Sequence, residues 1–349
     1  MRMTAHAAKA RDGYVLVAAL VVLAIAGLAT ASAAQRTGDL VERVRLLTLE
    51  ARAERAGADA LERAAWAFTT SAVAPCGLVP DAPLNADRLA GGGVEGGACA
   101  PLDGRWRLSA AEDGLPVQLL DGAALLSVNG PAARQTRRLA ERFDQGARAQ
   151  ALHDALLDHT DGDSIAKTFG AEAARYADGR RGARNAPMIT PYEIMDVAGW
   201  APLVSPFLFS VTSARAAAGL NPSTAPAIAL AYGLGLNARE AEAIVAAREG
   251  TLGWGTRAAF EQALDRPLDE VGTLETVFRL EPSVRVRVDR PGGGVEERVI
   301  EYRPAPDVPA VRTLYRMRLP DDAGPVSAPV GLLPGPDRAA AQSDEGDAA

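Results

Sequence analysis

The sequence predicts an α+β protein with a long N-terminal helix, an antiparallel sheet and a large helical insertion. Three observations predict this class. Residues 14–34 are 21 consecutive residues without a charge, residues 125–277 have Ala-rich helical patterning, and apolar side chains alternate with period two after Val277. Helical and strand patterns that occupy separate parts of a chain are typical of the α+β class.

Composition narrows the classes of protein to which the chain can belong. The 349 residues are 48% hydrophobic and 23% charged, which suits one or two globular domains and excludes collagen-like, disordered and multi-span membrane chains. The net charge of -7 argues against a dedicated nucleic-acid binder. Lys9 and Lys167 are the sole lysines, and three histidines and two cysteines leave little material for a zinc site.

The apolar stretch at residues 14–34 is predicted to cross a membrane. A helix that rises 1.5 Å per residue spans a hydrocarbon core of about 30 Å with this length. Because Arg2, Lys9 and Arg11 precede it, the short leader is expected in the cytoplasm and the bulk of the chain in the periplasm or outside the cell. A secretory signal peptide cleaved near residues 31–33, Ala-Ser-Ala, is the alternative.

The helix is expected to continue well past the membrane. Residues 35–68 contain no strong helix breaker, and Leu40, Val44 and Leu47 recur among Arg, Glu and Ala. Gly57 is the main weak point of this pattern. The sequence therefore predicts one helix with a membrane half and a soluble half.

The junction between the leader and the apolar stretch resembles that of a type IV prepilin. Arg11, Asp12 and Gly13 stand immediately before the large hydrophobic residue Tyr14. The resemblance implies that a prepilin peptidase of the inner membrane cuts after Gly13 and methylates the new amino terminus at Tyr14.

The fifth residue of this expected mature chain is Ala18, where most pilins carry a glutamate. A charge inside lipid needs a partner, and in that family the glutamate is thought to pair with the amino terminus of the subunit ahead. The minor pseudopilins K of type II secretion systems regularly lack it and are proposed to sit at the filament tip. Ala18 resembles that group, although a plain membrane anchor needs no glutamate either.

Cys76 and Cys99 flank a loop that contains three consecutive glycines, Gly91, Gly92 and Gly93. In an oxidising compartment the cysteines can form a disulfide across 22 intervening residues. Such a cross-link stabilises by about 3 kcal/mol on the chain-entropy model. The alternative is a pair of unpaired small hydrophobic residues.

Two short strands are predicted next, at residues 105–108 and 117–120. The turn-like sequence Glu112, Asp113 and Gly114 separates them. Together they resemble the first strands of a pilin head domain.

The helical stretch contains two similar openings, at residues 127–132 and 219–226. Each is an Asn-led turn before an Ala-rich helix, where Asn, Ser or Thr can cap free amides and Pro fits the first turn. The second continues as a helix, a Gly turn at residues 233–235 and another helix, which is a helix-hairpin-helix pattern. Such hairpins often bind DNA phosphates, but Glu240 and Glu242 follow this turn, and structural packing is the favoured interpretation.

This stretch resembles the inserted all-α domain, helix-hairpin-helix or SAM-like, of the minor pseudopilins K. That domain carries an Asn-led turn with Thr and Ala before each hairpin. Asn221, Thr224 and Ala225 match the turn, and Asn129 with Ala132 match a degraded copy of it.

Three carboxylates, Asp158, Asp161 and Asp163, lie within six residues at the end of a predicted helix. Carboxylate oxygens suit calcium, although the spacing is not that of an EF-hand. Pseudopilin K holds calcium in its helical domain, so the resemblance implies a structural calcium site at these residues, with Glu172 as a further candidate ligand. The alternative is a solvated acidic turn.

After Val277 the pattern predicts an antiparallel β-meander. Val284, Val286 and Val288 alternate with Arg285 and Arg287, and a Gly-rich turn leads into a second strand at residues 295–303. A third strand at residues 311–319 places five side chains on one face: Val311, Thr313, Tyr315, Met317 and Leu319. This meander needs burial against the soluble half of the N-terminal helix, since an isolated hairpin is marginal.

The expected organisation has six parts. They are a leader at residues 1–13, a transmembrane half-helix at 14–34, the soluble half-helix and first strands at 35–120, the inserted helical domain at 121–277, the meander at 278–319 and a disordered acidic tail at 320–349.

No enzyme is expected. His153 and His159 lie six residues apart and are predicted to be surface residues, so no Ser/His/Asp set or zinc pair can be built with them. The Gly runs lie in loop and hairpin turns and not after a strand as phosphate-binding loops do.

The resemblance as a whole implies a minor pseudopilin of the type II secretion system, at the tip of a periplasmic pseudopilus that drives protein export across the outer membrane. It implies other minor pseudopilins, of I and J type, as partners, a single-pass location in the inner membrane, and no nucleic-acid partner. The alternative is a type IV pilus assembly or DNA-uptake protein with a helix-hairpin-helix domain.

Overall fold

The computed structural model describes most of the chain. The described residues are 5–79, 99–109, 114–129, 133–144, 146–172, 175–176, 182–203, 206–215, 219–249, 251–268, 276–291, 293–302 and 311–319. Gly91 to Gly93, the turn residues Glu112 and Asp113, and the tail from residue 320 lie outside them. The chain divides into two compact units, Met1–Arg55 and Ala56–Ala349, and the second is called the head below.

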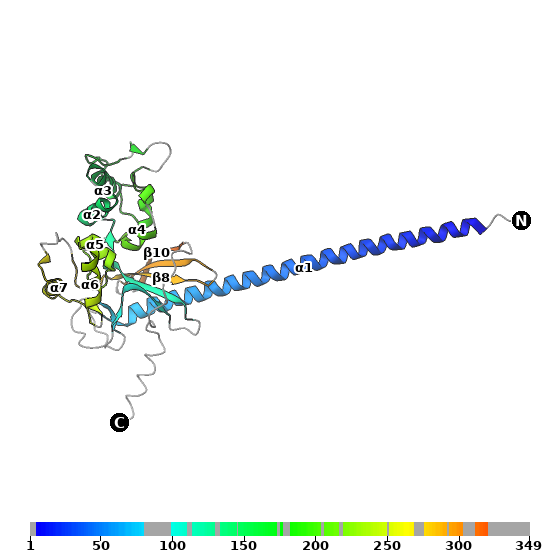
Figure 1. The fold of residues 1–349 in the computed structure, drawn as a ribbon, viewed down its shortest axis with the longest axis horizontal. Coiled ribbons are helices and arrows are strands. Elements are labelled where there is room, and N and C mark those ends of the chain that lie inside the picture. The colour runs from blue at the N-terminus through cyan, green and yellow to red at the C-terminus, as the bar shows by residue number, and fades with distance from the viewer. Residues whose placement is uncertain are drawn as a thin grey trace, which may run out of the picture. The chain divides into compact units, whose positions relative to one another are not determined.

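Helix α1, Ala5–Thr70, is a single element, as the sequence predicts (Figure 1). Among the described residues, the segment Tyr14–Thr70 of α1 is long and apolar enough to cross a membrane. No part of its most apolar stretch of 18 residues is buried. The hydroxyl of Thr30 donates to the backbone oxygen of Ala26 at 3.0 Å, so this polar group is satisfied within the helix.

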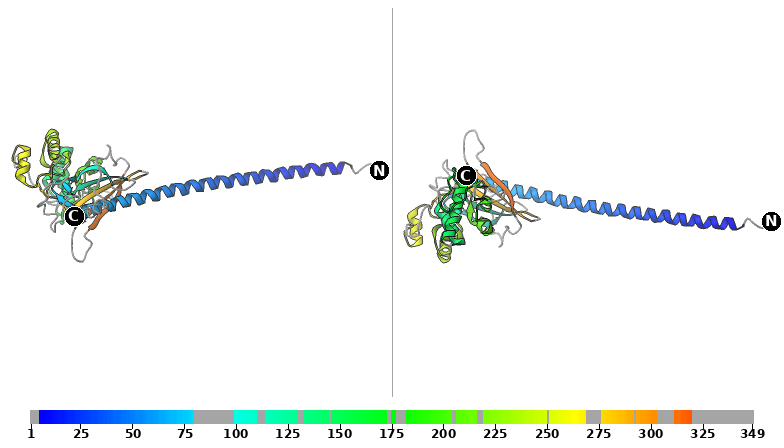
Figure 2. Two further views of the ribbon diagram at one scale, coloured as in Figure 1. Left: turned by 90° about the horizontal axis from the view of Figure 1, so that it is seen from below. Right: turned by 90° about the horizontal axis from the view of Figure 1, so that it is seen from above.

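The head is built on a five-stranded antiparallel sheet (Figures 1 and 2). The strand order is β10-β9-β8-β5-β4. The bounds are β4 Asp103–Leu108, β5 Pro116–Asp121, β8 Ser283–Asp289, β9 Val295–Tyr302 and β10 Val311–Leu319. All five predicted strands are present, and the structure adds the pairing of β5 with β8 across the insertion, with Val117 opposite Val288. The α+β class is therefore confirmed.

One face of this sheet packs on the last turns of α1. Val284, Val286 and Val288 of β8 lie in one buried cluster with Leu61 and Phe68 of the helix. Burial of these side chains supplies the hydrophobic contact that the predicted meander needs.

A second small sheet follows α1 directly. It consists of β1 Ala72–Ala74, β2 Gly77–Val79 and β3 Ala100–Pro101, all antiparallel. The predicted disulfide between Cys76 and Cys99 is present and joins the start of β2 to β3.

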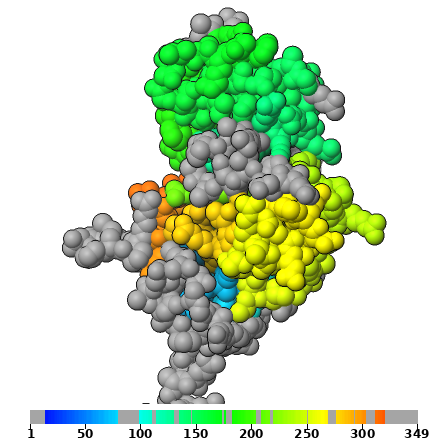
Figure 3. Space-filling view, turned by 90° about the vertical axis from the view of Figure 1, so that its left-hand side faces the viewer, coloured from blue at the N-terminus to red at the C-terminus, as the bar shows by residue number. Residues whose placement is uncertain are grey.

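The insertion between β5 and β8 has its own hydrophobic core, centred on fully buried Trp200 and Phe260. In Figure 3 its residues, coloured green to yellow, cover most of the visible described surface of the head. Its α-helices are α2 Ala133–Phe143, α3 Ala147–Thr160, α4 Pro206–Val211, α5 Ala227–Leu234, α6 Ala238–Arg248 and α7 Arg257–Leu264. Its short 3-10 helices are η1 Gly122–Ala124, η3 Pro191–Asp196 and η4 Ala201–Leu203.

The sequence predicts an all-α insertion, but the structure also contains two short strands in it. Strands β6 Leu126–Ser127 and β7 Thr212–Ser213 form a short parallel pair. Because these two segments are far apart along the chain and only two residues long each, local periodicity does not reveal them.

The asparagine of the second predicted turn does not cap the helix that follows it, and the residues directly before α2, after the first turn, lie outside the described residues. Among the described side chains none caps α5, whose N-cap residue is Pro226. Instead the buried Asn221 amide donates to Asp121 Oδ2 at 2.9 Å, and the buried Asn129 amide donates to the backbone oxygen of Met188 at 2.8 Å. Burial raises the pKa of Asp121 to about 6, so this carboxylate depends on its donors Asn221 and Thr224 at neutral pH. Each asparagine therefore ties distant segments together.

The other face of the sheet carries a buried layer of charge. Glu297 of β9 is fully buried, and it accepts a hydrogen bond from Arg287 Nε at 2.6 Å and one from the Tyr315 hydroxyl at 2.7 Å. Arg285 donates to the backbone oxygen of Phe209 in α4 at 2.9 Å. The arginines of the alternating β8 pattern thus face the insertion and not solvent.

The predicted face of the last strand is interrupted. The register of β10 against β9 shifts between Thr313 and Tyr315, so a bulge at Leu314 separates Val311 and Thr313 from the later residues of that face. Strict alternation along the whole of β10 was therefore a wrong prediction.

Candidate metal centre

Side chains of α3 accept hydrogen bonds from the loop that follows the acidic turn. Asp154 and Asp158, one turn apart on α3, accept backbone N–H bonds from the returning loop. Phe169 donates to Asp154 Oδ2 at 3.2 Å, and Lys167 donates to Asp158 Oδ2 at 3.1 Å. These bonds fold residues 161–172 back over the end of α3.

The close approach of this loop depends on Gly170. A Cβ atom at this position would collide with Asp158 Oδ2, which belongs to a fully buried side chain. By contrast, a Cβ atom on Gly162 in the same loop would meet nothing within 4 Å.

The loop brings three carboxylates together. One oxygen from each of Asp161, Asp163 and Glu172 lies within 4.8 Å of the others. Glu172 is 9% exposed, and its Oε1 atom and Asp161 Oδ1 are buried without a hydrogen-bond partner among the described residues. Buried acceptors usually have hydrogen-bond partners, so these two oxygens are the feature of the cluster that needs an explanation.

Asn185 is hydrogen-bonded to the segment that carries Asp163. Its amide donates to the backbone oxygen of Asp163 and to Ser164 Oγ, while its Oδ1 atom is buried without a partner among the described residues. Its positive φ of 51° places it in the left-handed region that asparagine tolerates. Sequence reasoning did not select Asn185 as a site residue, because it lies 22 residues from Asp163.

The structure thus groups the predicted ligands differently from the sequence. Asp158 is turned to the backbone of the loop and is a structural residue beneath the cluster. Glu172, the further candidate, lies with Asp161 and Asp163.

Lys167 lies at the same cluster. Its Nζ atom donates to Asp161 Oδ2 at 2.8 Å and lies 3.5 Å from Asp158 Oδ1. The side chain is 35% exposed, so its ammonium group is at the edge of the cluster and in contact with solvent.

The prediction that His153 and His159 are surface residues was wrong. Both are buried on α3, at 7% and 3% exposure, and burial lowers the pKa of each imidazole. His153 Nδ1 lies 3.3 Å from Thr136 Oγ1. Both histidines therefore help to pack α3 against the rest of the insertion.

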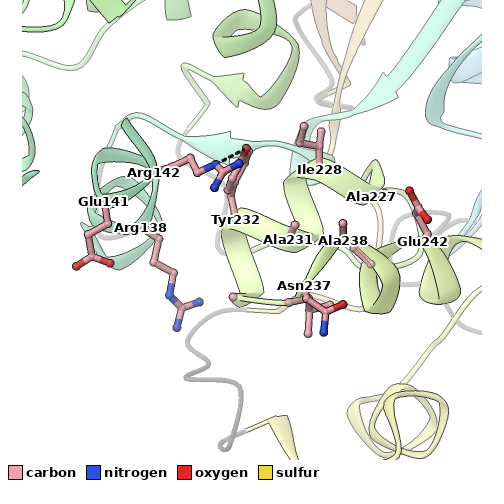
Figure 4. A pocket seen from close by; sticks show the side chains of 13 residues that line it. Arg138, Glu141, Arg142, Ala227, Ile228, Ala231, Tyr232, Asn237, Ala238 and Glu242 are labelled. Atoms are coloured by element: carbon pink, nitrogen blue, oxygen red, sulfur yellow. Dashed lines mark hydrogen bonds between the residues drawn. The ribbon is translucent and has the colours of Figure 1, made fainter. Parts of the chain in front are cut away.

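A groove of about 670 Å³ lies along the predicted hairpin, between α2, α5 and α6 (Figure 4). Gly235 ends α5 with a φ of 68°, and Asn237 caps α6 by accepting from the Glu240 N–H at 2.9 Å. The two arginines of the groove are engaged, since Arg138 donates to the backbone oxygen of Gly233 and Arg142 to the Tyr232 hydroxyl. With glutamates also on its lining, this groove is a poor match for a phosphate backbone.

The predicted processing residues lie in α1. Gly13 and Tyr14 are consecutive helical residues, and the Tyr14 side chain is 78% exposed. Exposed apolar side chains follow it along the helix, with Val15, Leu16 and Val17 at 58–66% exposure.

Comparisons with known proteins give the following. No protein-family model and no curated protein matches the chain. A solved structure described as the GspK-GspI-GspJ complex of the type 2 secretion system from enterotoxigenic Escherichia coli contains a chain with 17% sequence identity and a TM-score of 0.48. The match covers 81% of this chain and 99% of that chain.

Proposed function

We propose that this chain is a minor pseudopilin of K type, anchored in the inner membrane with its head in the periplasm. It would form the tip of a type II secretion pseudopilus together with minor pseudopilins of I and J type. Its role is assembly and not catalysis. The observation that carries the proposal is α1, whose apolar N-terminal part is exposed while its last turns form the core of the head.

Helix packing is the proposed mechanism of assembly. Beyond the predicted membrane half, α1 still exposes large apolar side chains, with Leu40, Val41, Val44 and Leu47 at 61–64% exposure. Exposure of these side chains to water is unfavourable, and their burial against another apolar surface would release free energy. Equivalent helices of partner subunits would cover them when α1 leaves the bilayer.

The tip position is supported by two features of the chain. Ala18 supplies no carboxylate for the amino terminus of a subunit ahead. In addition, the insertion between β5 and β8 enlarges the head by a domain with its own core. A subunit with nothing to pair ahead of it and a bulky head suits the end of a filament.

Replacement of Gly13 by valine should block removal of the leader, since glycine is the residue before the proposed cleavage site. The expected result is a full-length chain on mass spectrometry and loss of secretion in cells that carry the variant alone. Gly162→Val is the control, because a Cβ atom at Gly162 meets nothing within 4 Å and the residue lies outside α1. Unchanged secretion with an uncleaved Gly13→Val chain would refute the pseudopilin proposal.

We further propose that the acidic cluster holds a structural calcium ion. The donor set consists of oxygens from Asp161, Asp163 and Glu172, and calcium takes six to eight such ligands. Asn185 Oδ1 is a further proposed ligand, because it is buried without a partner among the described residues and its amide group bonds the backbone of Asp163. The buried oxygens without partners fit a cation of this kind. When bound, the ion would link the end of α3 to the later loop at Asn185 and so order the insertion.

Calorimetric titration of the full chain with calcium should show binding that depends on Glu172. Replacement of this buried carboxylate by glutamine should weaken calcium affinity at least about tenfold, because one charged ligand is lost. Glu242→Gln changes an exposed glutamate of α6 in the same way and should leave the affinity unchanged. No heat and no shift in melting temperature with the unsubstituted chain would exclude the site.

A further inference from the structure

Lys167 is fixed beside the acidic cluster by its backbone. Its N–H donates to both carboxylate oxygens of Asp158, at 3.2 and 3.1 Å, so the start of the side chain stays in place whatever the ammonium group does. The ammonium group then reaches Asp161 Oδ2 at 2.8 Å. It thus occupies one oxygen of a proposed calcium ligand.

The charges at this point make the ammonium a competitor of a divalent cation. Four carboxylates, those of Asp158, Asp161, Asp163 and Glu172, lie in the loop and its base, and Lys167 contacts two of them. A cation between Asp161, Asp163 and Glu172 would lie within a few ångströms of the ammonium and repel it. The ammonium group and a divalent cation therefore compete for the carboxylate of Asp161.

The chemistry of lysine suits this arrangement. An ammonium is a single point charge on a flexible stem, whereas a guanidinium grips both oxygens of a carboxylate at once. Here Asp161 Oδ1 stays without a partner among the described residues while Oδ2 is bound. Because the Lys167 side chain is 35% exposed, its ammonium can leave for water without being buried elsewhere. In a chain whose basic residues are nearly all arginine, lysine stands at this position.

We propose that Lys167 is a tethered counter-cation of the cluster. Its ammonium neutralises Asp161 when no divalent cation is present, and it moves into solvent, still protonated, when calcium binds. This inference rests on the proposed calcium site. It adds that the chain carries its own monovalent substitute for the ion, which weakens calcium binding and keeps the loop folded without it.

Calorimetric calcium titration of the full chain in detergent micelles tests the competition. Lys167→Gln should bind calcium about tenfold more tightly than the unsubstituted chain, because the competing charge is gone. Lys167→Arg keeps that charge and should not bind more tightly. Arg184→Gln is the matched control, since Arg184 adjoins Asn185 but pairs with Glu193, and its affinity should stay within about twofold.

A second readout follows the lysine itself. The unprocessed chain has two lysines, of which Lys9 belongs to the proposed leader, so selective labelling of lysine with carbon-13 in this form gives two side-chain signals, and Lys9→Arg identifies that of Lys9. Saturating calcium should move the Lys167 signal to the position of a solvated lysine and leave the Lys9 signal in place.

The outcomes separate the two proposals. If calcium binds but Lys167→Gln does not bind it more tightly than the unsubstituted chain, the counter-cation proposal is refuted. The same holds if the Lys167 signal does not move. In both cases the calcium site stands. If calcium binds to Lys167→Gln but only weakly to the unsubstituted chain, both are supported. If neither form binds calcium, both are wrong.

Discussion

Replacement of Glu297 by glutamine should lower the free energy of unfolding of the head by about 3–5 kcal/mol. Glu297 is fully buried between Arg285 and Arg287, with its Oε2 atom 3.9 Å from Arg285 Nε and 2.6 Å from Arg287 Nε. Removal of the carboxylate charge leaves two buried guanidinium groups without their counter-ion. All four tryptophans lie in the head, so urea unfolding of the full chain followed by tryptophan fluorescence measures the loss.

The matched control is Glu62→Gln. Glu62 pairs with Arg298 at 2.6 Å, but its side chain is 68% exposed, so the change should stay within about 1 kcal/mol. Equal losses for the two variants would show that the buried layer is not a special link between sheet and insertion.

The stability that Glu297 contributes should depend on pH. Burial raises the pKa of Glu297, but the charges of Arg285 and Arg287 outweigh it and hold the pKa below its usual range. A carboxylate with a lowered pKa in the folded state contributes stability above its pKa in the unfolded chain, about 4.3. The difference between the unsubstituted chain and Glu297→Gln should therefore shrink as the pH falls below that value.

Gly170→Ala should both destabilise the insertion and weaken calcium binding. The added Cβ atom would collide with the buried carboxylate of Asp158, so the loop must move away from α3. Overpacking of this kind costs about 1–3 kcal/mol. Urea unfolding and calorimetric calcium titration of the full chain measure the two effects.

Gly162→Ala is the matched control in the same loop. Its Cβ atom would meet nothing within 4 Å, and the expected change in stability is within about 0.5 kcal/mol. If Gly162→Ala and Gly170→Ala behave alike, the anchoring of the loop by Asp158 is not what shapes the cluster.

The sequence predicted the strands of the head better than it predicted which segments pack against them or pair with them. Period-two alternation identified β8 because Val284, Val286 and Val288 share one face, and that face packs on α1 as expected. The pattern does not reveal that Arg285 and Arg287 are buried as well, because their cover comes from the insertion. Likewise the pairing of β5 with β8 depends on segments that are separated by the whole inserted domain.

The candidate site shows the same limit. Three closely spaced aspartates signalled an acidic turn, but their directions depend on how the loop returns over α3. Asp158 is used to accept the Lys167 N–H, and the place in the cluster goes to Glu172. Asn185 comes from a later loop, and nothing in its local sequence marks it as a neighbour of Asp163.

The central claim is that α1 begins at a processed amino terminus within the membrane and ends as the core of an exported head. Amino-terminal sequencing of the chain extracted from membranes tests it most directly. We expect a mature chain that begins at Tyr14 and remains in the membrane fraction. A chain that begins near Ala34 and is recovered in solution would contradict it.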